Sequence, residues 1–311
     1  MARKPKALTP GDTLGLIAPS GCVQDADRVD QAAACLSGLG FRVKIAPGCR
    51  ASWGYLAGKD GVRAADLNAF FADPEVDGIV CLKGGYGTPR ILDAVDYRSA
   101  ARHPKVLVGY SDITGLHLAL ARKCGLVTFH GPMPGSDMLP EFDALSRAGW
   151  LSALMATDPL GPLANPGADR LETLVGGTAR GPLAGGNLSL VAATMGTPYE
   201  IEARGRILFL EDVDEAPYRV DRMLTQLRLA GKFRQCAGIL LGDWKDCAPG
   251  EGRPSLTLRQ VFEEVLAPCG KPVSCGFRAG HCRPAATFPF GVEAVLDADA
   301  GTLEFTEAAA R

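Results

Sequence analysis

Residues 105–120 read KVLVGYSDITGLHLAL. The hydrophobic run 106–108 stops at Gly109-Tyr110, and a segment with helical spacing of apolar residues begins directly after Ser111. This pattern predicts a buried strand that turns at once into a helix. Ser111 at that corner has two possible roles. It can cap the helix N-terminus, or it can be a nucleophile, since a tight strand-to-helix turn pushes a hydroxyl out of the sheet.

The first half of the chain repeats this alternation. Strand-like TLGLIAPS (13–20), FRVKIA (41–46), VDGIVCLKGGYG (76–87) and GLVTFHGP (125–132) alternate with helix-like stretches. Strands and helices of these lengths predict a parallel sheet covered on both faces. We expect this α/β domain to span residues 1–160. The Pro- and Gly-rich segment 161–179 is expected to be a linker, and residues 180–311 a mixed α/β domain with more hairpins.

The composition argues against several classes of function. Hydrophobic residues make up 47% and charged residues 22%, as in globular proteins. The net charge of −2 gives no electrostatic reason to expect nucleic acid or membrane partners, and no apolar run is long enough to cross a bilayer. The ten cysteines are scattered, without a Cys-x-x-Cys pair or a signal peptide, so we expect free thiols in the cytoplasm. The four histidines lack zinc-ligand spacing, so no metal is expected.

The loop CLKGGYGTPR (81–90) is a glycine turn whose spacing matches neither Gly-x-Gly-x-x-Gly nor a P-loop. Gly84 and Gly85 allow backbone N–H groups to approach a ligand closely. The loop is expected at the same sheet edge as Ser111, because ligands bind at the carboxyl ends of parallel strands. The N–H groups of Gly85 and Asp112 are therefore candidates for an oxyanion hole.

Two further residues complete a possible catalytic set. Glu211 follows a hydrophobic strand in LFLEDVDEAPYRVDR (208–222), and a carboxylate at the end of a buried strand usually has a partner. Asp214 and Glu215 are better explained as first-turn acids of the next helix. His281 lies in a loop of small residues and prolines. Ser111, His281 and Glu211 together supply a nucleophile, a base and an orienting carboxylate.

Six segments in this order resemble the LD-carboxypeptidase family of serine peptidases: GDTLGLIAPSG (11–21), LKGGYGTPRIL (82–92), GYSDITGLHLAL (109–120), GPLAGGNLSL (181–190), LFLEDVDEAPYRVDRML (208–224) and GHCRPAATFPFG (280–291). The resemblance implies a flavodoxin- or amidotransferase-like N-terminal domain and a smaller mixed domain with β-barrel-like character. It also implies a Ser111–Glu211–His281 triad, with Glu215 as the alternative acid, and an oxyanion hole at Gly85 and Asp112. The serine then comes from one domain and the acid and base from the other.

The implied reaction is release of the terminal D-alanine from cytoplasmic murein tetrapeptides, without metal or cofactor, by a homodimer. A substrate with a free carboxylate calls for a cation in the pocket. Lys83 and Arg90 flank the glycine loop and are the candidates, with Gly84 and Tyr86 as further substrate-binding positions. Lys83 and Tyr110 stand where family members often have Arg and Phe.

Two alternatives remain open. Immunity members of the same family hydrolyse peptidyl-nucleotide antibiotics, which would require an aromatic clamp for the base. Trp53, Tyr55, Phe129 and Trp244 are the residues considered for it. A non-catalytic two-domain ligand-binding protein is the alternative of another class.

Overall fold

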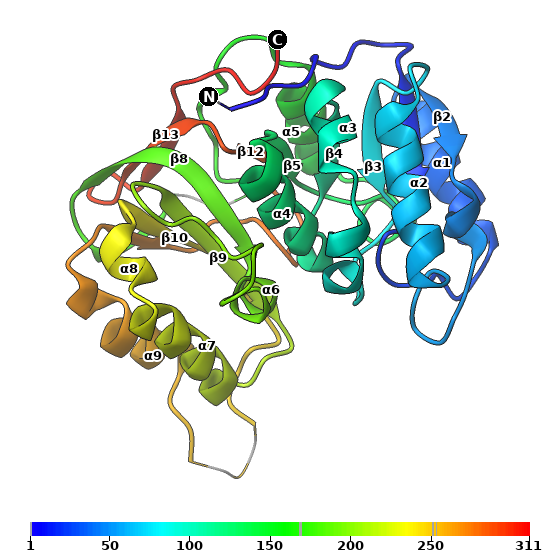
Figure 1. Ribbon diagram of the computed structural model, residues 1–311. Coiled ribbons are helices and arrows are strands. Elements are labelled where there is room, and N and C mark those ends of the chain that lie inside the picture. Colours follow the sequence, from blue (N-terminus) through cyan, green and yellow to red (C-terminus); the bar gives the residue numbers. More distant parts are fainter. Residues whose placement is uncertain (1, 168–169, 251, 253) are drawn as a thin grey trace.

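The computed structural model describes residues 2–167, 170–250, 252 and 254–311. It consists of two α/β domains, each built on one sheet, lying side by side (Figure 1). The expected two-domain α/β fold is confirmed.

The first sheet has the strand order β12-β5-β4-β3-β1-β2. Its strands from the first half of the chain are all parallel, and the order 2-1-3-4-5 is that of flavodoxin-like folds. These strands are β1 (Thr13–Ile17), β2 (Arg42–Ile45), β3 (Gly78–Cys81), β4 (Val106–Gly109) and β5 (Thr128–His130). The connections after β1, β3 and β4 therefore meet at one edge of the sheet.

The helices of this domain pack beside the sheet (Figure 1), and along the chain they follow its strands. The α-helices are α1 (Asp27–Gly38), α2 (Asp60–Ala72), α3 (Tyr97–Arg102), α4 (Thr114–Cys124) and α5 (Ala144–Met155). Short 3₁₀ segments are η1 (Pro47–Arg50), η2 (Thr88–Ala94) and η3 (Ser111–Ile113). Ser111 thus opens a 3₁₀ turn that leads directly into α4.

The second sheet is mixed and has the order β6-β14-β13-β8-β9-β10-β11-β7. Its central strands β8 to β11 are parallel, and the outer ones are antiparallel. The strands are β6 (Gly161–Pro162), β7 (Glu172–Val175), β8 (Thr178–Asn187), β9 (Ile207–Val213), β10 (Gly238–Lys245), β11 (Val273–Cys275), β13 (Glu293–Asp297) and β14 (Thr302–Phe305). The helical segments are α6 (Leu188–Ala193), α7 (Pro217–Leu229), α8 (Lys232–Gln235), α9 (Leu258–Val265) and η4 (Ala267–Cys269).

A strand from the second half of the chain belongs to the first sheet and so connects the two domains. Strand β12 (Phe288–Phe290) comes from the second half of the chain but pairs antiparallel with β5 of the first sheet. The segment 161–179, expected to be a linker, supplies β6 and β7 to the two ends of the second sheet. These pairings make the relative position of the two sheets part of the fold.

Side-chain alternation on β9 gives the second sheet two buried faces. Leu208 and Leu210 pack with residues of α7 and α9 in a core of their own. Ile207 and Phe209 point the other way, into the core shared with the first domain. Glu211 has the same parity as Phe209, so the strand register directs its carboxylate toward the first domain.

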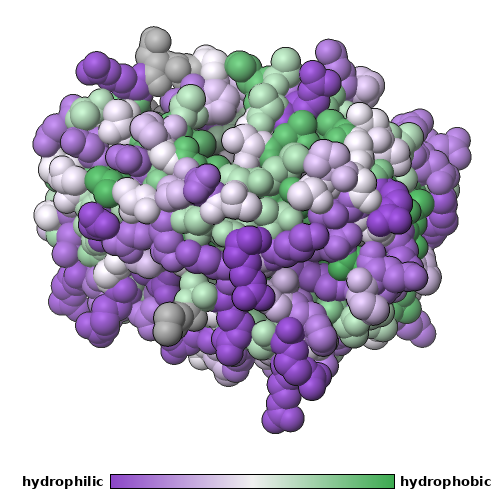
Figure 2. All heavy atoms as spheres, turned by 90° about the horizontal axis from the view of Figure 1, so that it is seen from above, coloured by the Kyte–Doolittle hydropathy of each residue, from purple (hydrophilic) through white to green (hydrophobic). Residues whose placement is uncertain are grey.

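On the face shown in Figure 2, hydrophilic side chains predominate and apolar area is broken into small patches. Among the described residues, no helix is both long enough and apolar enough to cross a membrane.

An aromatic cluster at the junction dominates this shared core, and Phe288 lies at its centre. The ring is fully buried, stacks on His130 at 5.0 Å and contacts Phe209 edge-on at 5.0 Å.

We expect Phe288→Ala to lower the free energy of unfolding by about 3–5 kcal/mol, measured by urea denaturation. Leu229→Ala, at a position 77% exposed on α7, is the control and should change it by less than about 0.5 kcal/mol. Equal effects of the two substitutions would contradict this account of the junction.

Candidate active site

The backbone at Ser111 decides between the two roles of this serine. Its φ is +62°, a left-handed conformation that non-glycine residues rarely adopt. Tyr110 occupies the N-cap position of η3, and no side chain caps that turn. The Ser111 hydroxyl is therefore not a helix cap, and its strained corner holds it toward the second domain.

His281 links Ser111 to Glu211. Its Nε2 lies 3.2 Å from Ser111 Oγ, and its Nδ1 lies 2.7 Å from Glu211 Oε2. Since a carboxylate only accepts, Nδ1 carries the proton and Nε2 faces the hydroxyl as an acceptor. The structure thus brings together three residues that the sequence placed 100 and 70 positions apart, in an arrangement suited to proton transfer from Ser111.

Burial shapes the charges of this pair. Glu211 is completely buried, which raises its pKa, although the hydrogen bond from His281 works in the opposite direction. Burial would lower the pKa of His281, but the hydrogen bond and negative charge of Glu211 outweigh it and raise that pKa above its ordinary value of 6.5. Glu211 therefore both orients the imidazole and stabilises its protonated form.

Tyr110 supports the other side of the imidazole. Its ring meets His281 edge-on with 4.9 Å between centroids, and its hydroxyl donates to Asp137 Oδ1 at 2.7 Å. Asp137 also accepts from the backbone N–H of Met133 at 2.8 Å. Sequence analysis did not assign Asp137, because it lies in a loop with no motif of its own.

The glycine loop lies directly against Ser111. A Cβ placed on Gly84 would be 2.9 Å from Ser111 Cβ and 3.6 Å from the Asp112 nitrogen. Gly85 is exposed with φ +123°, and within the described part of the chain its N–H donates no hydrogen bond. The N–H groups of Gly85 and Asp112 therefore stay the candidates for an oxyanion hole.

The Asp112 carboxylate fixes these loops relative to one another. It is buried, and its Oδ2 accepts from Ser20 Oγ at 2.6 Å and from the Thr88 N–H at 2.8 Å. The Thr88 hydroxyl in turn donates to the Asp112 carbonyl. One side chain therefore joins the connections after β1, β3 and β4. The sequence pattern gave no signal for Ser20 or for this role of Thr88.

Two cavities border the site. One, of about 620 Å³, is lined by Tyr110, His281 and the cationic residues Lys245, Arg278 and Arg283. The other, of about 760 Å³, is lined by Gly85, Lys83 and Tyr86 together with the loops 21–26 and 50–55. The first cavity thus meets the site at His281 and the second at Gly85, and each is large enough for a peptide segment.

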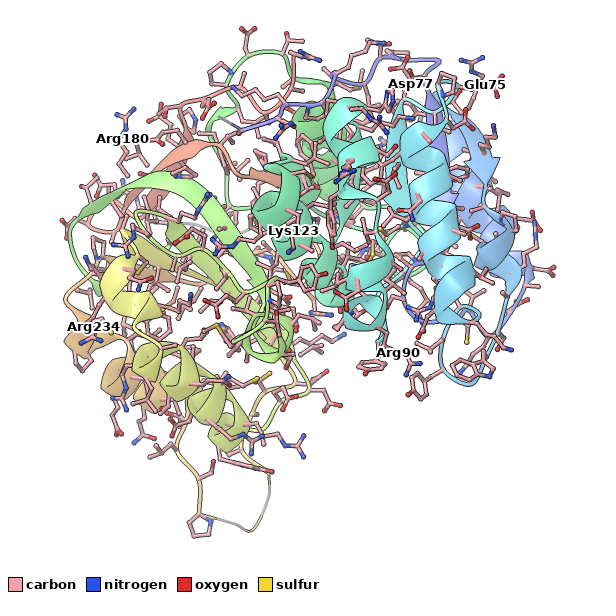
Figure 3. The ribbon with its side chains drawn as sticks, viewed as in Figure 1. Glu75, Asp77, Arg90, Lys123, Arg180 and Arg234 are labelled. Carbon is pink, nitrogen blue, oxygen red and sulfur yellow. The ribbon has the colours of Figure 1, made fainter. Side chains whose placement is uncertain are left out.

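The candidate cations differ in their surroundings. Lys83 Nζ donates to the Cys22 carbonyl at 3.3 Å and lines the second cavity. Arg90 lies at the edge of the molecule (Figure 3), where its guanidinium forms a two-point ion pair with Asp60 at 3.0 Å. Arg278, which sequence analysis did not consider, lines the first cavity with a buried Nε that has no hydrogen-bond partner among the described residues.

The alternative acid and the candidate aromatic residues lie in different surroundings. Glu215 pairs with Arg219 at 3.5 Å, whereas Glu211 contacts His281. Tyr55 and Tyr86 are exposed at the second cavity and meet edge-on at 5.6 Å. Phe129 is fully buried, and Trp244 packs on Phe262.

Comparison with known protein families identifies both halves of the chain. Residues 14–131 match the model of the LD-carboxypeptidase N-terminal domain, and residues 180–296 match that of the LD-carboxypeptidase C-terminal domain. The chain belongs to the LD-carboxypeptidase family. It is accordingly a serine-type LD-carboxypeptidase, and the non-catalytic binding protein considered above is set aside.

Relatives of this LD-carboxypeptidase share nearly its whole length. A probable murein peptide carboxypeptidase of Bacillus subtilis is 44% identical over 94% of this chain and 91% of the relative. The murein tetrapeptide carboxypeptidase of Pseudomonas aeruginosa is 32% identical over 91% and 92% of the two chains. Among solved structures, MccF in complex with glutamyl sulfamoyl guanosine is 25% identical, with a TM-score of 0.90 over 99% of both chains.

The raised pKa of His281 predicts a pH dependence. Only neutral His281 can accept the serine proton, so kcat/KM should fall as the pH drops through a value above 6.5. In Glu211→Gln the negative charge is lost, so this inflection should move to lower pH and the maximal rate should fall about 10²- to 10⁴-fold. Glu215→Gln should leave the inflection in place. If the inflection of the pH profile moves in Glu215→Gln but not in Glu211→Gln, then Glu215 is the carboxylate that acts on His281.

Gly84→Ala tests the contact between the glycine loop and the nucleophile. The added methyl group would meet Ser111 Cβ at 2.9 Å, so the serine or the loop must move. Because a displacement of about 1 Å can cost about 10²-fold in rate, we expect kcat to fall by that order while the protein remains folded by circular dichroism. Gly149→Ala is the control, since a methyl group there meets no atom within 4 Å. Full activity of Gly84→Ala would contradict the assigned position of the loop.

Proposed function

We propose that this enzyme hydrolyses the L,D-peptide bond that releases the terminal D-alanine from murein tetrapeptides, with Ser111 as nucleophile. The observation that carries the proposal is the position of His281, 3.2 Å from Ser111 Oγ and 2.7 Å from Glu211 Oε2. The substrate class rests on the murein peptide carboxypeptidase of Bacillus subtilis, which shares 44% of the aligned residues.

In the proposed mechanism, His281 Nε2 takes the Ser111 proton while Glu211 holds the imidazole. Ser111 Oγ attacks the diaminopimelyl carbonyl of L-alanyl-γ-D-glutamyl-meso-diaminopimelyl-D-alanine. The N–H groups of Gly85 and Asp112 stabilise the oxyanion. His281 then protonates the amine of D-alanine, which leaves, and water releases the shortened peptide from Ser111 by the same proton transfers.

The terminal carboxylate of the substrate needs a cation. Lys83 in one cavity and Lys245 and Arg278 in the other are the groups that can serve. Arg90 is paired with Asp60, and Arg283 is paired with Asp143. The ten cysteines are all free thiols in the structure, which supports a cytoplasmic site of action on recycled muropeptides.

The second candidate function is hydrolysis of peptidyl-nucleotides. It is supported by the similarity to MccF, whose solved complex contains glutamyl sulfamoyl guanosine. The exposed rings of Trp53, Tyr55 and Tyr86 lie near the second cavity and could stack on a base. The higher identity to murein peptide carboxypeptidases favours the tetrapeptide.

The experiment is D-alanine release from the murein tetrapeptide. We expect turnover by the wild type and a loss of about 10³-fold or more in kcat for Ser111→Ala and His281→Ala. Ser37→Ala, at an exposed position of α1, is the matched control and should retain full activity. If the wild type does not release D-alanine, the murein tetrapeptide is not the substrate and a peptidyl-nucleotide is favoured. An active Ser111→Ala would remove the mechanism.

A further inference from the structure

A third cavity lies between the two domains, away from the two that border His281 and Gly85. Its volume is about 250 Å³, below the range of about 300–1,000 Å³ usual for drug-sized ligands. One wall is α4 of the first domain, and the opposite wall is β8 of the second. The segment 201–206 and the end of β12 close the remaining sides.

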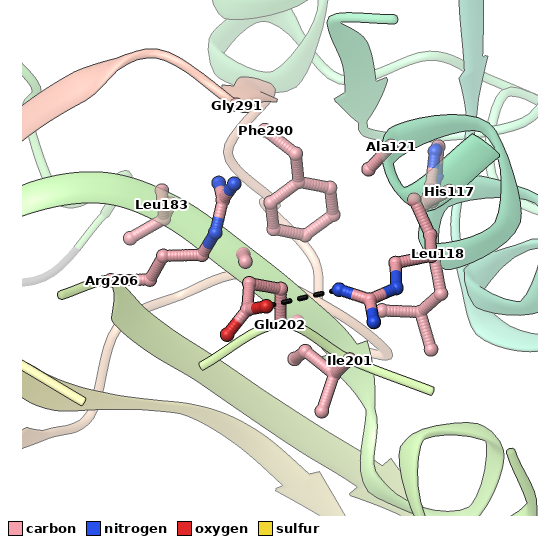
Figure 4. A pocket seen from close by; sticks show the side chains of 12 residues that line it. His117, Leu118, Ala121, Leu183, Ile201, Glu202, Arg206, Phe290 and Gly291 are labelled. Carbon is pink, nitrogen blue, oxygen red and sulfur yellow. Dashed lines mark hydrogen bonds and ion pairs between the residues drawn. The ribbon is translucent and has the colours of Figure 1, made fainter. Parts of the chain in front are cut away.

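The lining combines an apolar floor with a charged rim. Phe290, Leu118 and Leu183 provide the floor. Figure 4 shows Glu202 and Arg206 at the same cavity as the Phe290 ring. With Arg122, which also lines the cavity, the charged residues are one carboxylate and two guanidinium groups beside an apolar surface.

Glu202 and Arg206 differ in the hydrogen bonds that their side chains form. Glu202 Oε2 accepts from Arg122 at 3.0 Å, in an ion pair that is nearly half exposed. Arg206 is only partly exposed, and its guanidinium donates no hydrogen bond within the described residues. Its neighbour Glu202 attracts it, but burial dominates and lowers its pKa. A partly buried guanidinium without a hydrogen-bonded acceptor favours an anionic ligand group.

We propose that this cavity binds a free α-amino acid with an apolar side chain. The carboxylate of the ligand would pair with Arg206, its ammonium group with Glu202, and its side chain would contact Phe290 and Leu118. The carboxylate of such a ligand gives Arg206 the acceptor it lacks, and the ammonium group shares Glu202 with Arg122 and the Arg204 N–H. Its size matches the small volume. This site is separate from the proposed active site and does not depend on the substrate assigned there.

The walls of the cavity lead directly to the catalytic residues. His117, on the α4 wall, donates from Nε2 to the Gly109 carbonyl at 2.9 Å, two residues before Ser111. The first residue of α4, Thr114, accepts through Oγ1 from the Asn187 N–H at the end of β8 at 2.9 Å. Asn187 in turn is paired in register with Glu211. A ligand that bridges both walls therefore stabilises the arrangement in which Ser111 meets His281.

The test is binding of L-leucine and D-leucine to the wild-type enzyme, by isothermal titration calorimetry and by the shift in Tm. We expect saturable leucine binding that raises the Tm. In Ser111→Ala, murein tetrapeptide bound at the active site should not displace leucine. N-acetyl-L-leucine lacks the ammonium group and 3-methylbutylamine lacks the carboxylate, so each should bind at least tenfold more weakly than leucine. Tetrapeptide that displaces leucine would place it in the active site and overturn the proposal.

Variants of the rim locate the site. Arg206→Met and Glu202→Gln should each weaken leucine binding at least tenfold while leaving basal turnover unchanged. Arg204→Met is the matched control, since Arg204 is exposed on the same segment and does not line the cavity. Glu202 is exposed, so its variant retains the fold even if Arg206→Met does not. The absence of binding to the wild type, or equal affinity in Glu202→Gln and wild type, would overturn the proposal.

Discussion

The hydrogen bond between His281 and Ser111 joins residues 170 positions apart, one from each domain. Its 3.2 Å separation exists only if the two sheets keep a fixed relation to each other. The shared aromatic core of His130, Phe209, Phe288 and Phe290 and the bond from Asn187 to Thr114 provide that relation. Much of the packing between the domains can therefore be understood as support for a single contact.

A second constraint lies in the backbone of Ser111 itself. The left-handed conformation of Ser111 costs roughly 1–2 kcal/mol relative to an ordinary turn. The Asp112 carboxylate, with its bonds to Ser20 and Thr88, holds the surrounding loops and keeps the corner from relaxing. Small residues make the corner possible, because any side chain on Gly84 would occupy the space of the serine hydroxyl.

The sequence predicted most of the first sheet, because strand periodicity and glycine turns are local signals. It also pointed to Glu211, since a carboxylate in a buried strand requires a partner. It could not reveal that β12 joins the first sheet or that 161–179 contributes strands, because those pairings join distant segments. The same limit applies to Arg90. Its position beside the glycine loop suggested a substrate contact, but Asp60, 30 residues away, binds its guanidinium. Asp112 illustrates the converse, since its N–H was considered from sequence and its carboxylate was not.

The pairing of β12 with β5 also orders events during synthesis. Residues 288–290 are synthesised about 160 residues after β5, yet they complete the sheet that the first 130 residues begin. Until they arrive, β5 presents an unpaired edge and Phe129, Phe209 and His130 lack part of their cover. His281 arrives in the same late segment. A chain that stops before this segment therefore lacks both the last strand of the first sheet and the imidazole that contacts Ser111 and Glu211.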